Sequence, residues 1–401
     1  MKECIIISNT CSNEYYKYLQ SIKYSEKLSP SQKYFHMLIE GLNAIEDCEV
    51  KCVSLRSIDI SNSRIQKLDR FDEIENGVYF TYIPVISRKI IKNINNIIGG
   101  YRITKEQLRG KNIEDTILIF DPLSYDISLG ALLASKRFKK CGLVTDLPYY
   151  MSQINKEYKV SVIKQKIRVC LMNFVLNRFD MFCFLTDSMN VINKKNKPHL
   201  IVEGMVYWRK QLQISHVSNN IVLYAGGLYE QYGIRTLIEA AKKIEMNNFE
   251  IHFYGEGPAV ELIKSAEKDY PNIKYKGVLS LDEIIEAEKN AKLLINPRPS
   301  KEKFTEFSFP SKTLEYLSTG RPVITTRLKG IPEGYFDYLI PIEIETVDGI
   351  KNTIESCLSK SDDELDEIGF CGLKYVMKNK NNEVQAAKLW NFMMSEIKKT
   401  E

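Results

Sequence analysis

The chain has 401 residues, 44% of them hydrophobic and 27% charged, and its 56 Lys and Arg against 51 Asp and Glu give a net charge of +5. This composition is that of an ordinary soluble globular protein, and the length predicts two domains of roughly 150–200 residues. The mild charge argues against a nucleic-acid-binding surface. No run approaches the roughly 18 consecutive apolar residues of a membrane span.

The N-terminal stretch and the cysteines indicate a cytoplasmic protein. MKECIIISNT turns polar after three consecutive isoleucines, which is too short for a signal peptide and predicts a first buried strand. The nine cysteines follow no ligand spacing, and the closest pair, Cys48 and Cys52, has no histidine nearby. We therefore expect buried thiols in a reducing compartment, without disulfides or a metal site.

Strand and helix patterns alternate over the first half of the chain. Apolar runs predict strands, and the segments between them fit helices, one of which carries an apolar stripe and is expected to end near Gly41. The predicted strands are residues 4–8, 50–55, 78–83, 116–120, 140–144 and 181–185, and the predicted helices are 31–42, 128–138 and 160–177. This alternation predicts a doubly wound, mostly parallel α/β sheet.

After a polar hinge at residues 207–219, the pattern restarts and several strands end in glycine. The strand at residues 220–225 runs directly into a glycine pair, and two later strands end in the same way. Glycine permits a tight turn and a close approach of the backbone to a ligand. We therefore expect a nucleotide to lie across this sheet edge, against Gly226, Gly227, Gly255, Glu256, Gly277 and Val278.

Residues 296–334 contain the strongest chemical signal of the chain. A strand at 293–295 leads through a polar loop to a short helix at 310–319 and a strand at 323–326. Free backbone N–H groups near Ser311, Lys312 and Thr313 would favour an anion at the helix start, and the Glu315 carboxylate can accept hydrogen bonds from a sugar diol. The alternative is an ordinary surface pair between Lys312 and Glu315 at i,i+3, and spacing alone leaves both open.

The string FPSKTLEYLSTGRPVI resembles the donor-site signature of the glycosyltransferases of family four, which have the GT-B fold. The neighbouring NPRPS resembles a subset that builds bacterial surface polysaccharides. The resemblance is strong over residues 200–345 and extends to the first half only in layout. It implies that Glu315 binds the ribose, and that Ser311 and Lys312 lie against the donor diphosphate.

The GT-B fold implies two Rossmann-like doubly wound domains that face each other across a cleft. Residues 1–206 would bind the acceptor, residues 207–382 would bind the nucleotide sugar, and a helix at 383–401 would cross back onto the first domain. The apolar stripe of that helix could equally pack on the second domain alone.

The sequence departs from the family where relatives carry a cationic clamp for the diphosphate. Gly227 and Tyr232 occupy the positions of the usual Arg and Lys, and Phe307 replaces a glutamate eight residues before Glu315, with Glu306 one place away. A diphosphate leaving group still needs positive charge in the transition state. Without an Asp-x-Asp metal motif, we expect a metal-independent site in which Arg298 and Lys312 are catalytic, with Arg235 and Arg327 as further candidate cations.

Two segments of the first half match the family's acceptor side. Ser31, Gln32 and Lys33 resemble a segment near the acceptor cleft, although a plain helix cap by Ser29 or Ser31 explains the same residues. Thr145 and Asp146 follow a strand at the place where many relatives put a residue facing the donor sugar. Asp146 is therefore a candidate catalytic residue, and the alternative is that it caps the next helix.

Residues 158–180 combine lysines and arginines with apolar residues at helical spacing. Such a basic amphipathic helix can contact an anionic membrane and hold an enzyme near a lipid-linked acceptor. The alternative is that the apolar stripe belongs to the core and the cations are solvated.

The resemblance implies a retaining hexosyltransferase without a cofactor or a covalent protein nucleophile. Its donor would be a nucleotide-diphosphate sugar, a UDP-sugar first and a GDP-sugar second, and its acceptor an oligosaccharide, polyprenyl-linked at the inner face of the membrane, in polysaccharide biosynthesis. A dehydrogenase is disfavoured because no complete G-x-G-x-x-G precedes an acidic residue by about 20 positions. A non-catalytic GT-B subunit that supports a partner glycosyltransferase remains the alternative, because the usual Arg and Lys are missing.

Overall fold

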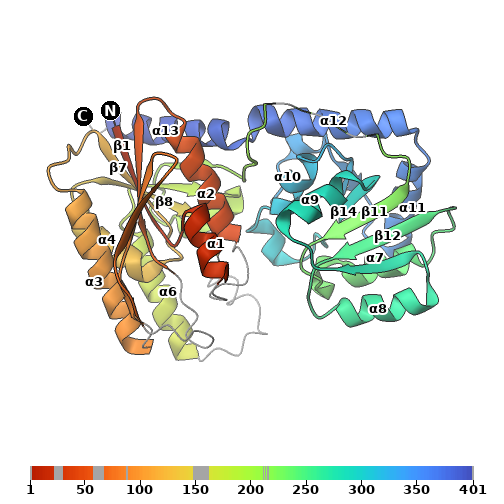
Figure 1. Cartoon of the computed structure of the whole chain (residues 1–401), viewed down its shortest axis with the longest axis horizontal. Helices are drawn as coiled ribbons and strands as arrows, with labels where there is room; N and C mark the ends of the chain where they lie inside the picture. The colour runs from red at the N-terminus through yellow and green to blue at the C-terminus, as the bar shows by residue number, and fades with distance from the viewer. Residues whose placement is uncertain are drawn as a thin grey trace. The chain divides into compact units, whose positions relative to one another are not determined.

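A computed structural model describes residues 2–21, 30–56, 67–86, 89–147, 162–210, 212, 214 and 216–399. The chain divides into two compact units, one formed by Met1–Met205 with Asn382–Glu401 and the other by Val206–Asn381 (Figure 1). The sequence placed the corresponding boundaries after residues 206 and 382.

The first unit is built on an eight-stranded sheet with the strand order β10-β9-β8-β7-β1-β2-β5-β4. Its strands pair in parallel except for β4 and β5, which form an antiparallel hairpin at one edge. The predicted strands are confirmed, whereas β4, β10 and the small pair β3–β6 were not predicted. The strands are β1 (Lys2–Ser8), β2 (Cys48–Ser54), β3 (Lys67–Leu68), β4 (Phe71–Glu75), β5 (Val78–Tyr82), β6 (Val85–Ile86), β7 (Thr116–Phe120), β8 (Lys139–Val144), β9 (Met181–Phe184) and β10 (His199–Ile201).

Helices cover both faces of this sheet, which explains why its central strands are continuous apolar runs. Parallel crossovers are right-handed, so α3, α4 and α6 cover one face while α1 and α2 cover the other (Figure 1). The helices are α1 (Asn13–Ser21), α2 (Pro30–Asn43), α3 (Lys89–Gln107), α4 (Tyr125–Ala134), α6 (Val162–Leu176) and the 3₁₀ turn η1 (Asp187–Ile192).

The C-terminal helix α13 (Asn382–Lys398) belongs to the first unit and packs on α2. A Cβ atom added at Gly41 would lie 2.2 Å from the carbonyl oxygen of Asn382, and Gln385 Nε2 donates to Gly204 O at 2.8 Å. The predicted return of this helix to the first domain is confirmed, and packing on the second domain alone is wrong. The predicted helix at 31–42 is confirmed as α2, which ends at Asn43, and Gly41 lies in its last turn, where the missing side chain permits close packing with α13.

The second unit contains a six-stranded, fully parallel sheet with the order β13-β12-β11-β14-β15-β16. One core of Val, Leu, Ile, Phe and Ala side chains lies between this sheet and its helices. Its strands are β11 (Asn220–Ala225), β12 (Phe249–Tyr254), β13 (Ile273–Gly277), β14 (Leu293–Asn296), β15 (Val323–Thr326) and β16 (Ile340–Ile342). Its helices are α7 (Ile234–Ala241), α8 (Val260–Asp269), α9 (Leu281–Lys289), α10 (Ser311–Leu317), α11 (Val347–Leu358) and α12 (Asp362–Asn379), with 3₁₀ turns η2 (Glu230–Tyr232), η3 (Lys303–Glu306) and η4 (Glu333–Tyr335).

The contact between α2 and α13 predicts that Gly41→Ala is destabilising. The added methyl group would overlap the Asn382 carbonyl oxygen at 2.2 Å, and such overpacking typically costs about 1–3 kcal/mol. We expect the midpoint of thermal unfolding to fall by several degrees, since each kcal/mol corresponds to roughly 2–4 °C in a unit of this size. Gly334→Ala is the control, because nothing lies within 4 Å of its added Cβ. Equal midpoints for the two variants would contradict the prediction.

Candidate functional site

The loops that follow β11, β12 and β13 form a continuous backbone floor at the carboxyl edge of the second sheet. Gly226 N donates to Tyr254 O at 3.0 Å, and Gly255 N donates to Gly277 O at 2.8 Å. Gly255 has φ +128°, and a Cβ atom there would lie 1.9 Å from Gly226 O. Only glycine fits such a conformation and approach, so these predicted glycines are brought together.

Tyr316 fixes α10 to this edge. Its ring is fully buried, Ala225 N donates to Tyr316 Oη at 2.8 Å, and Tyr316 Oη donates to Ala225 O at 3.1 Å. The first turn of α10 therefore lies at the end of β11. Within that turn Ser311 is exposed, whereas Thr313 is buried and its N–H donates to Pro310 O at 2.9 Å.

Lys312 lies between two carboxylates. Its Nζ is 3.0 Å from Glu315 Oε2 and 3.8 Å from Glu288 Oε1. Burial opposes the charge of Lys312, but the carboxylates of Glu315 and Glu288 outweigh it and raise the pKa. The i,i+3 pair is therefore present, but both its side chains are about three-quarters buried (28% and 26% exposed) and it is shared with the buried Glu288 of α9. Sequence reasoning missed Glu288, because nothing in the α9 pattern marks it.

Arg298 reaches the same region from the loop after β14. Its Cζ lies 4.4 Å from the centroid of the Tyr232 ring and 6.0 Å from that of Phe304. Its Nε is buried and has no hydrogen-bond partner within the described part of the chain. The cation is thus held by aromatic faces.

Arg298 and Lys312 converge on the glycine pair that follows β11. A Cβ atom added at Gly226 would lie 3.8 Å from Lys312 Cε and 3.4 Å from Tyr224 Oη, which donates to Gly227 O at 2.9 Å. A Cβ atom added at Gly227 would lie 3.3 Å from the Tyr232 ring, and the centroid of that ring is 4.4 Å from Arg298 Cζ. Burial raises the pKa of Tyr224 to about 12, while the charges of Arg298 and Lys312 act in the opposite direction.

Other charged residues predicted near this site are engaged in ion pairs. Glu306 accepts from Lys329 Nζ at 2.7 Å. The two further candidate cations form exposed pairs, Arg235 with Glu230 at 2.7 Å and Arg327 with Glu333 at 2.7 Å. Glu256 and Val278 are exposed at the ends of the β12 and β13 loops.

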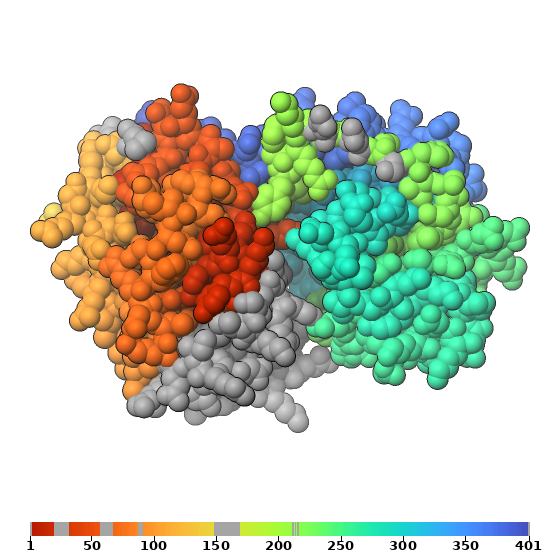
Figure 2. All heavy atoms as spheres, in the orientation of Figure 1, coloured from red at the N-terminus to blue at the C-terminus, as the bar shows by residue number. Residues whose placement is uncertain are grey.

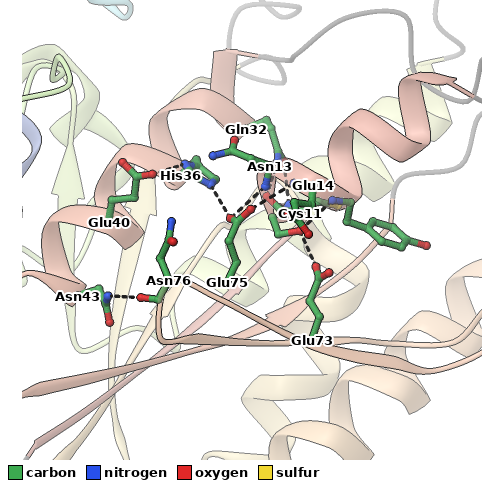
Figure 3. A network of polar contacts seen from close by, with 12 residues as sticks. Cys11, Asn13, Glu14, Gln32, His36, Glu40, Asn43, Glu73, Glu75 and Asn76 are labelled. Carbon is green, nitrogen blue, oxygen red and sulfur yellow. Dashed lines mark hydrogen bonds and ion pairs between the residues drawn. The ribbon is translucent and has the colours of Figure 1, made fainter.

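At the first unit's sheet edge, the side chain of Gln32 holds the loop after β1 (Figure 3). Cys11 N donates to Gln32 Oε1 at 3.2 Å, and Gln32 Nε2 donates to Cys11 O at 2.9 Å. The same turn of α2 carries Ser31 and the half-buried Lys33. Gln32 therefore positions this loop, and the acceptor role of the three residues stays a prediction.

The hairpin β4–β5 adds carboxylates that the sequence did not reveal. Glu75 accepts from Asn13 N at 3.1 Å and from Glu14 N at 3.2 Å, which satisfies two N–H groups at the start of α1 (Figure 3). The buried His36 lies 3.4 Å from Glu75 Oε2 and 3.5 Å from Glu40 Oε1.

Two strand ends carry further polar groups. After β8, Asp146 is exposed and its Oδ1 accepts from Leu147 N at 2.7 Å, next to the half-buried Thr145. Residues 148–161, which follow Asp146 up to α6, lie outside the described part of the chain, so the capping alternative stays a prediction. After β7, the buried carboxyl of Asp121 accepts from Leu123 N and Ser124 Oγ, both at 2.9 Å. Burial raises the pKa of Asp121 to about 6 despite these hydrogen bonds.

Across the described ranges, no group of three or more His, Cys, Asp or Glu side chains is arranged to hold a metal ion. Likewise, no described helix is both long and apolar enough to cross a membrane. The predicted helix at 160–177 corresponds to α6, and residues 158–161 of the predicted basic segment lie outside the described part.

Two α/β units with loops gathered at the carboxyl edges of their sheets define a GT-B protein, and solved structures confirm that fold. The chain is similar to a sucrose-phosphate synthase from Thermosynechococcus elongatus, with a TM-score of 0.65, 14% identity and 100% of both chains covered. It is also similar to a point mutant of S. aureus TarM in complex with fondaparinux, alpha-GlcNAc-glycerol and UDP, with a TM-score of 0.61, 13% identity, and 98% of this chain and 100% of TarM covered.

Sequence comparisons place the glycosyltransferase likeness in the second unit and beyond. Residues 219–360 match the family model described as Glycosyl transferases group 1. The chain is 24% identical over 277 residues to the uncharacterized glycosyltransferase MJ1178 of Methanocaldococcus jannaschii, which covers 67% of this chain and 72% of the relative. Together with the fold, these matches support a glycosyltransferase of the group 1, GT-B type.

The buried hydroxyl of Tyr316 predicts that Tyr316→Phe lowers the free energy of unfolding of the second unit. The variant removes both hydrogen bonds to Ala225, and a buried backbone group left without a partner costs about 1–3 kcal/mol. We expect a lower midpoint of urea unfolding for the second unit. Tyr229→Phe is the control, because Tyr229 is 43% exposed. Equal stability of the two variants would show that the Tyr316 hydroxyl does not hold α10.

The raised pKa of Asp121 predicts that the free energy of unfolding of the wild type, compared with that of Asp121→Asn, depends on pH. The pKa of Asp121 is about 6 in the folded state and about 3.9 in an unfolded chain, so the folded state binds more protons between these values. Its contribution to stability is fully present below pH ~4 and is lost as the pH rises through ~6. Relative to Asp121→Asn, the wild type should lose about 1 kcal/mol of unfolding free energy between pH ~5 and ~7.5, measured by urea unfolding. A constant difference would refute the raised pKa.

Proposed function

We propose that the chain is a retaining glycosyltransferase of family four that transfers a hexosyl group from a nucleotide-diphosphate sugar to a hydroxyl of an oligosaccharide. The observation that carries this proposal is the convergence of Arg298 and Lys312 on the glycine pair at the end of β11. Two cations above a floor of backbone glycines suit a diphosphate. Anomeric retention rests on the family resemblance.

In this proposal, charge stabilisation is the main chemical task of the protein. Arg298 and Lys312 would offset the negative charge that develops on the leaving diphosphate, and Glu315 would accept hydrogen bonds from the ribose. Because Glu315 also holds Lys312 at 3.0 Å, one carboxylate would align the ribose and the catalytic cation together. The leaving diphosphate would assist the acceptor hydroxyl, without a metal ion or covalent protein nucleophile, and Asp146 would face the donor sugar.

The substrates are proposed from the relatives and the motif resemblance. The TarM structure contains UDP, which supports a UDP-sugar first and a GDP-sugar second. The NPRPS motif supports an acceptor oligosaccharide of surface-polysaccharide synthesis, polyprenyl-linked and met at the inner face of the membrane. Ser31, Gln32, Lys33 and Thr145 would lie on the acceptor side, in a first domain of residues 1–206, and residues 207–382 would form the donor domain.

A second candidate is a non-catalytic GT-B subunit that supports a partner glycosyltransferase. Gly227 and Tyr232 stand where relatives carry the clamp Arg and Lys, which favours a chain that has lost catalysis. Under this alternative the nucleotide still binds, but the isolated chain does not turn over the donor.

A thermal-shift panel of UDP, GDP, ADP, CMP and their sugars tests the donor site. A ligand at 100 times its Kd should stabilise the protein by about 2.7 kcal/mol. We expect one nucleoside diphosphate to stabilise the wild type, and the shift to be lost in Glu315→Ala and Arg298→Ala. Lys243→Ala is the matched control, because Lys243 pairs with Asp348 on the surface at 2.8 Å, and this variant should respond like the wild type.

The outcomes separate the two candidates. If no nucleotide stabilises the wild type, the donor site is wrong. If one does, release of nucleoside diphosphate from the matching sugar by the isolated chain supports the enzyme, and binding without release supports the non-catalytic subunit.

A further inference from the structure

The outer face of α3 carries an apolar stripe. Ile91, Ile94 and Ile98 are 45%, 55% and 45% exposed, and their spacing of three and four residues places them on one side of the helix. Single exposed apolar residues are common on proteins, but three in a row along one helix form a patch of the kind that marks an interaction site. Figure 2 shows α3, in orange, at the surface of the first unit.

The fold does not need these isoleucines, because α3 packs through its other side. A Cβ atom at Gly100 would lie 2.6 Å from Ile127 O, and the buried Asn96 donates to Asp126 Oδ2 at 2.6 Å. Glycine and a buried amide bring α3 tightly against α4. The folded unit therefore does not bury the stripe.

The helix layer that contains this stripe is strongly basic. Residues 89–105 and 162–179 each contain four Lys or Arg and no Asp or Glu, and Lys136, Arg137 and Lys139 follow the end of α4, which itself has no Lys or Arg. The bordering acidic residues are engaged: Asp126 is buried beside Asn96, Glu106 pairs with Arg70 at 2.8 Å and Asp180 with Lys140 at 3.3 Å. The whole chain has 56 basic and 51 acidic residues, so the excess of basic residues is local to α3, α6 and the segment after α4.

Two cations extend the stripe along α3. Arg102 and Lys105 are exposed and lie four and seven residues beyond Ile98, which places them on the same side of the helix. The outer face of α3 therefore presents apolar and cationic side chains together.

α6 repeats the combination on the same face of the sheet. Leu171 and Phe174 are 37% and 41% exposed, and Arg178 Cζ lies 3.2 Å from the centroid of the Phe174 ring. An arginine on an exposed aromatic ring keeps its charge in water while its stem covers apolar surface.

We propose that the outer face of the α3–α4–α6 layer, centred on Ile91, Ile94 and Ile98, docks on the surface of an anionic lipid bilayer. Apolar side chains enter the boundary between headgroups and acyl chains, and the surrounding cations meet anionic headgroups. This inference rests on the membrane contact of the proposed function, deepens it and adds α3, which the sequence did not single out. A second copy of the chain fits less well, because a twofold interface would bring like charges together.

Flotation of the purified full chain with lipid vesicles tests the docking face. Vesicles of phosphatidylcholine alone are compared with vesicles that contain about one-third phosphatidylglycerol, at low and high salt. We expect binding to the anionic vesicles only, a weakening at high salt, and at least about a tenfold loss of binding in the double variant Ile94→Ser with Ile98→Ser. Arg102→Glu with Lys105→Glu should also lose binding.

The control removes two isoleucines elsewhere that are more exposed than Ile94 and Ile98. Ile74→Ser with Ile344→Ser changes residues that are 62% and 63% exposed, and this variant should bind vesicles like the wild type. Equal binding of the α3 variant and the wild type, or equal binding to neutral and anionic vesicles, overturns the proposal. The proposal is also overturned if the wild type forms a dimer that the α3 variant does not form, because the stripe would then be a contact between two copies of the chain. Nucleotide-induced thermal shifts of the α3 variant report the donor site separately, so one proposal can fail without the other.

Discussion

The backbone contact between the loops after β11 and β12 is the constraint on which the candidate site depends. A single methyl group at Gly255 would fall 1.9 Å from the carbonyl oxygen of Gly226, so the two loops approach as closely as peptide groups can and no side chain fits between them. The closeness leaves a surface of peptide groups at the carboxyl edge of the sheet, where open α/β sheets bind ligands. Tyr316 then brings α10 to the same edge through Ala225. Lys312, in the first turn of α10, is therefore held at this edge.

Aromatic side chains occupy the region where the family resemblance places the clamp Arg and Lys. A Cβ atom at Gly227 would lie 3.0 Å from the Tyr229 ring and 3.3 Å from the Tyr232 ring, so aromatic side chains fill the room that a longer side chain would need. Tyr232 in turn carries the guanidinium of Arg298 at 4.4 Å. A cation from the β14 loop thus stacks on the aromatic residue at the position where the resemblance places a lysine. Arginine suits this arrangement because its planar group stacks on rings and can still bind phosphate in two-pronged fashion.

The sequence predicted the features that local pattern encodes and missed those that depend on distant packing. Apolar runs followed by glycine predicted the strands and the backbone floor, and the motif around Lys312 and Glu315 located α10. Glu288 could not be found, since its approach to Lys312 depends on how α9 packs. The same holds for Glu75, which caps α1 only because a hairpin far along the chain folds beside it. The packing role of Gly41 could not be found either, because its sequence context does not show that α13 packs against it.

The two faces of the first unit's sheet differ in the surface that their helices leave exposed. On the α2 face, α13 packs against the unit's own helix, and the loop after β1 is held by Gln32 and bordered by carboxylates from the hairpin. On the α3–α4–α6 face, α3 packs on α4 through glycine and a buried amide, and the outer side of α3 keeps exposed isoleucines next to the exposed Arg102 and Lys105. A fold selected for stability alone gains nothing from that surface, because exposed isoleucine lowers solubility and clustered like charges repel one another. Such a surface suits a unit that docks on an anionic, apolar boundary, as proposed above.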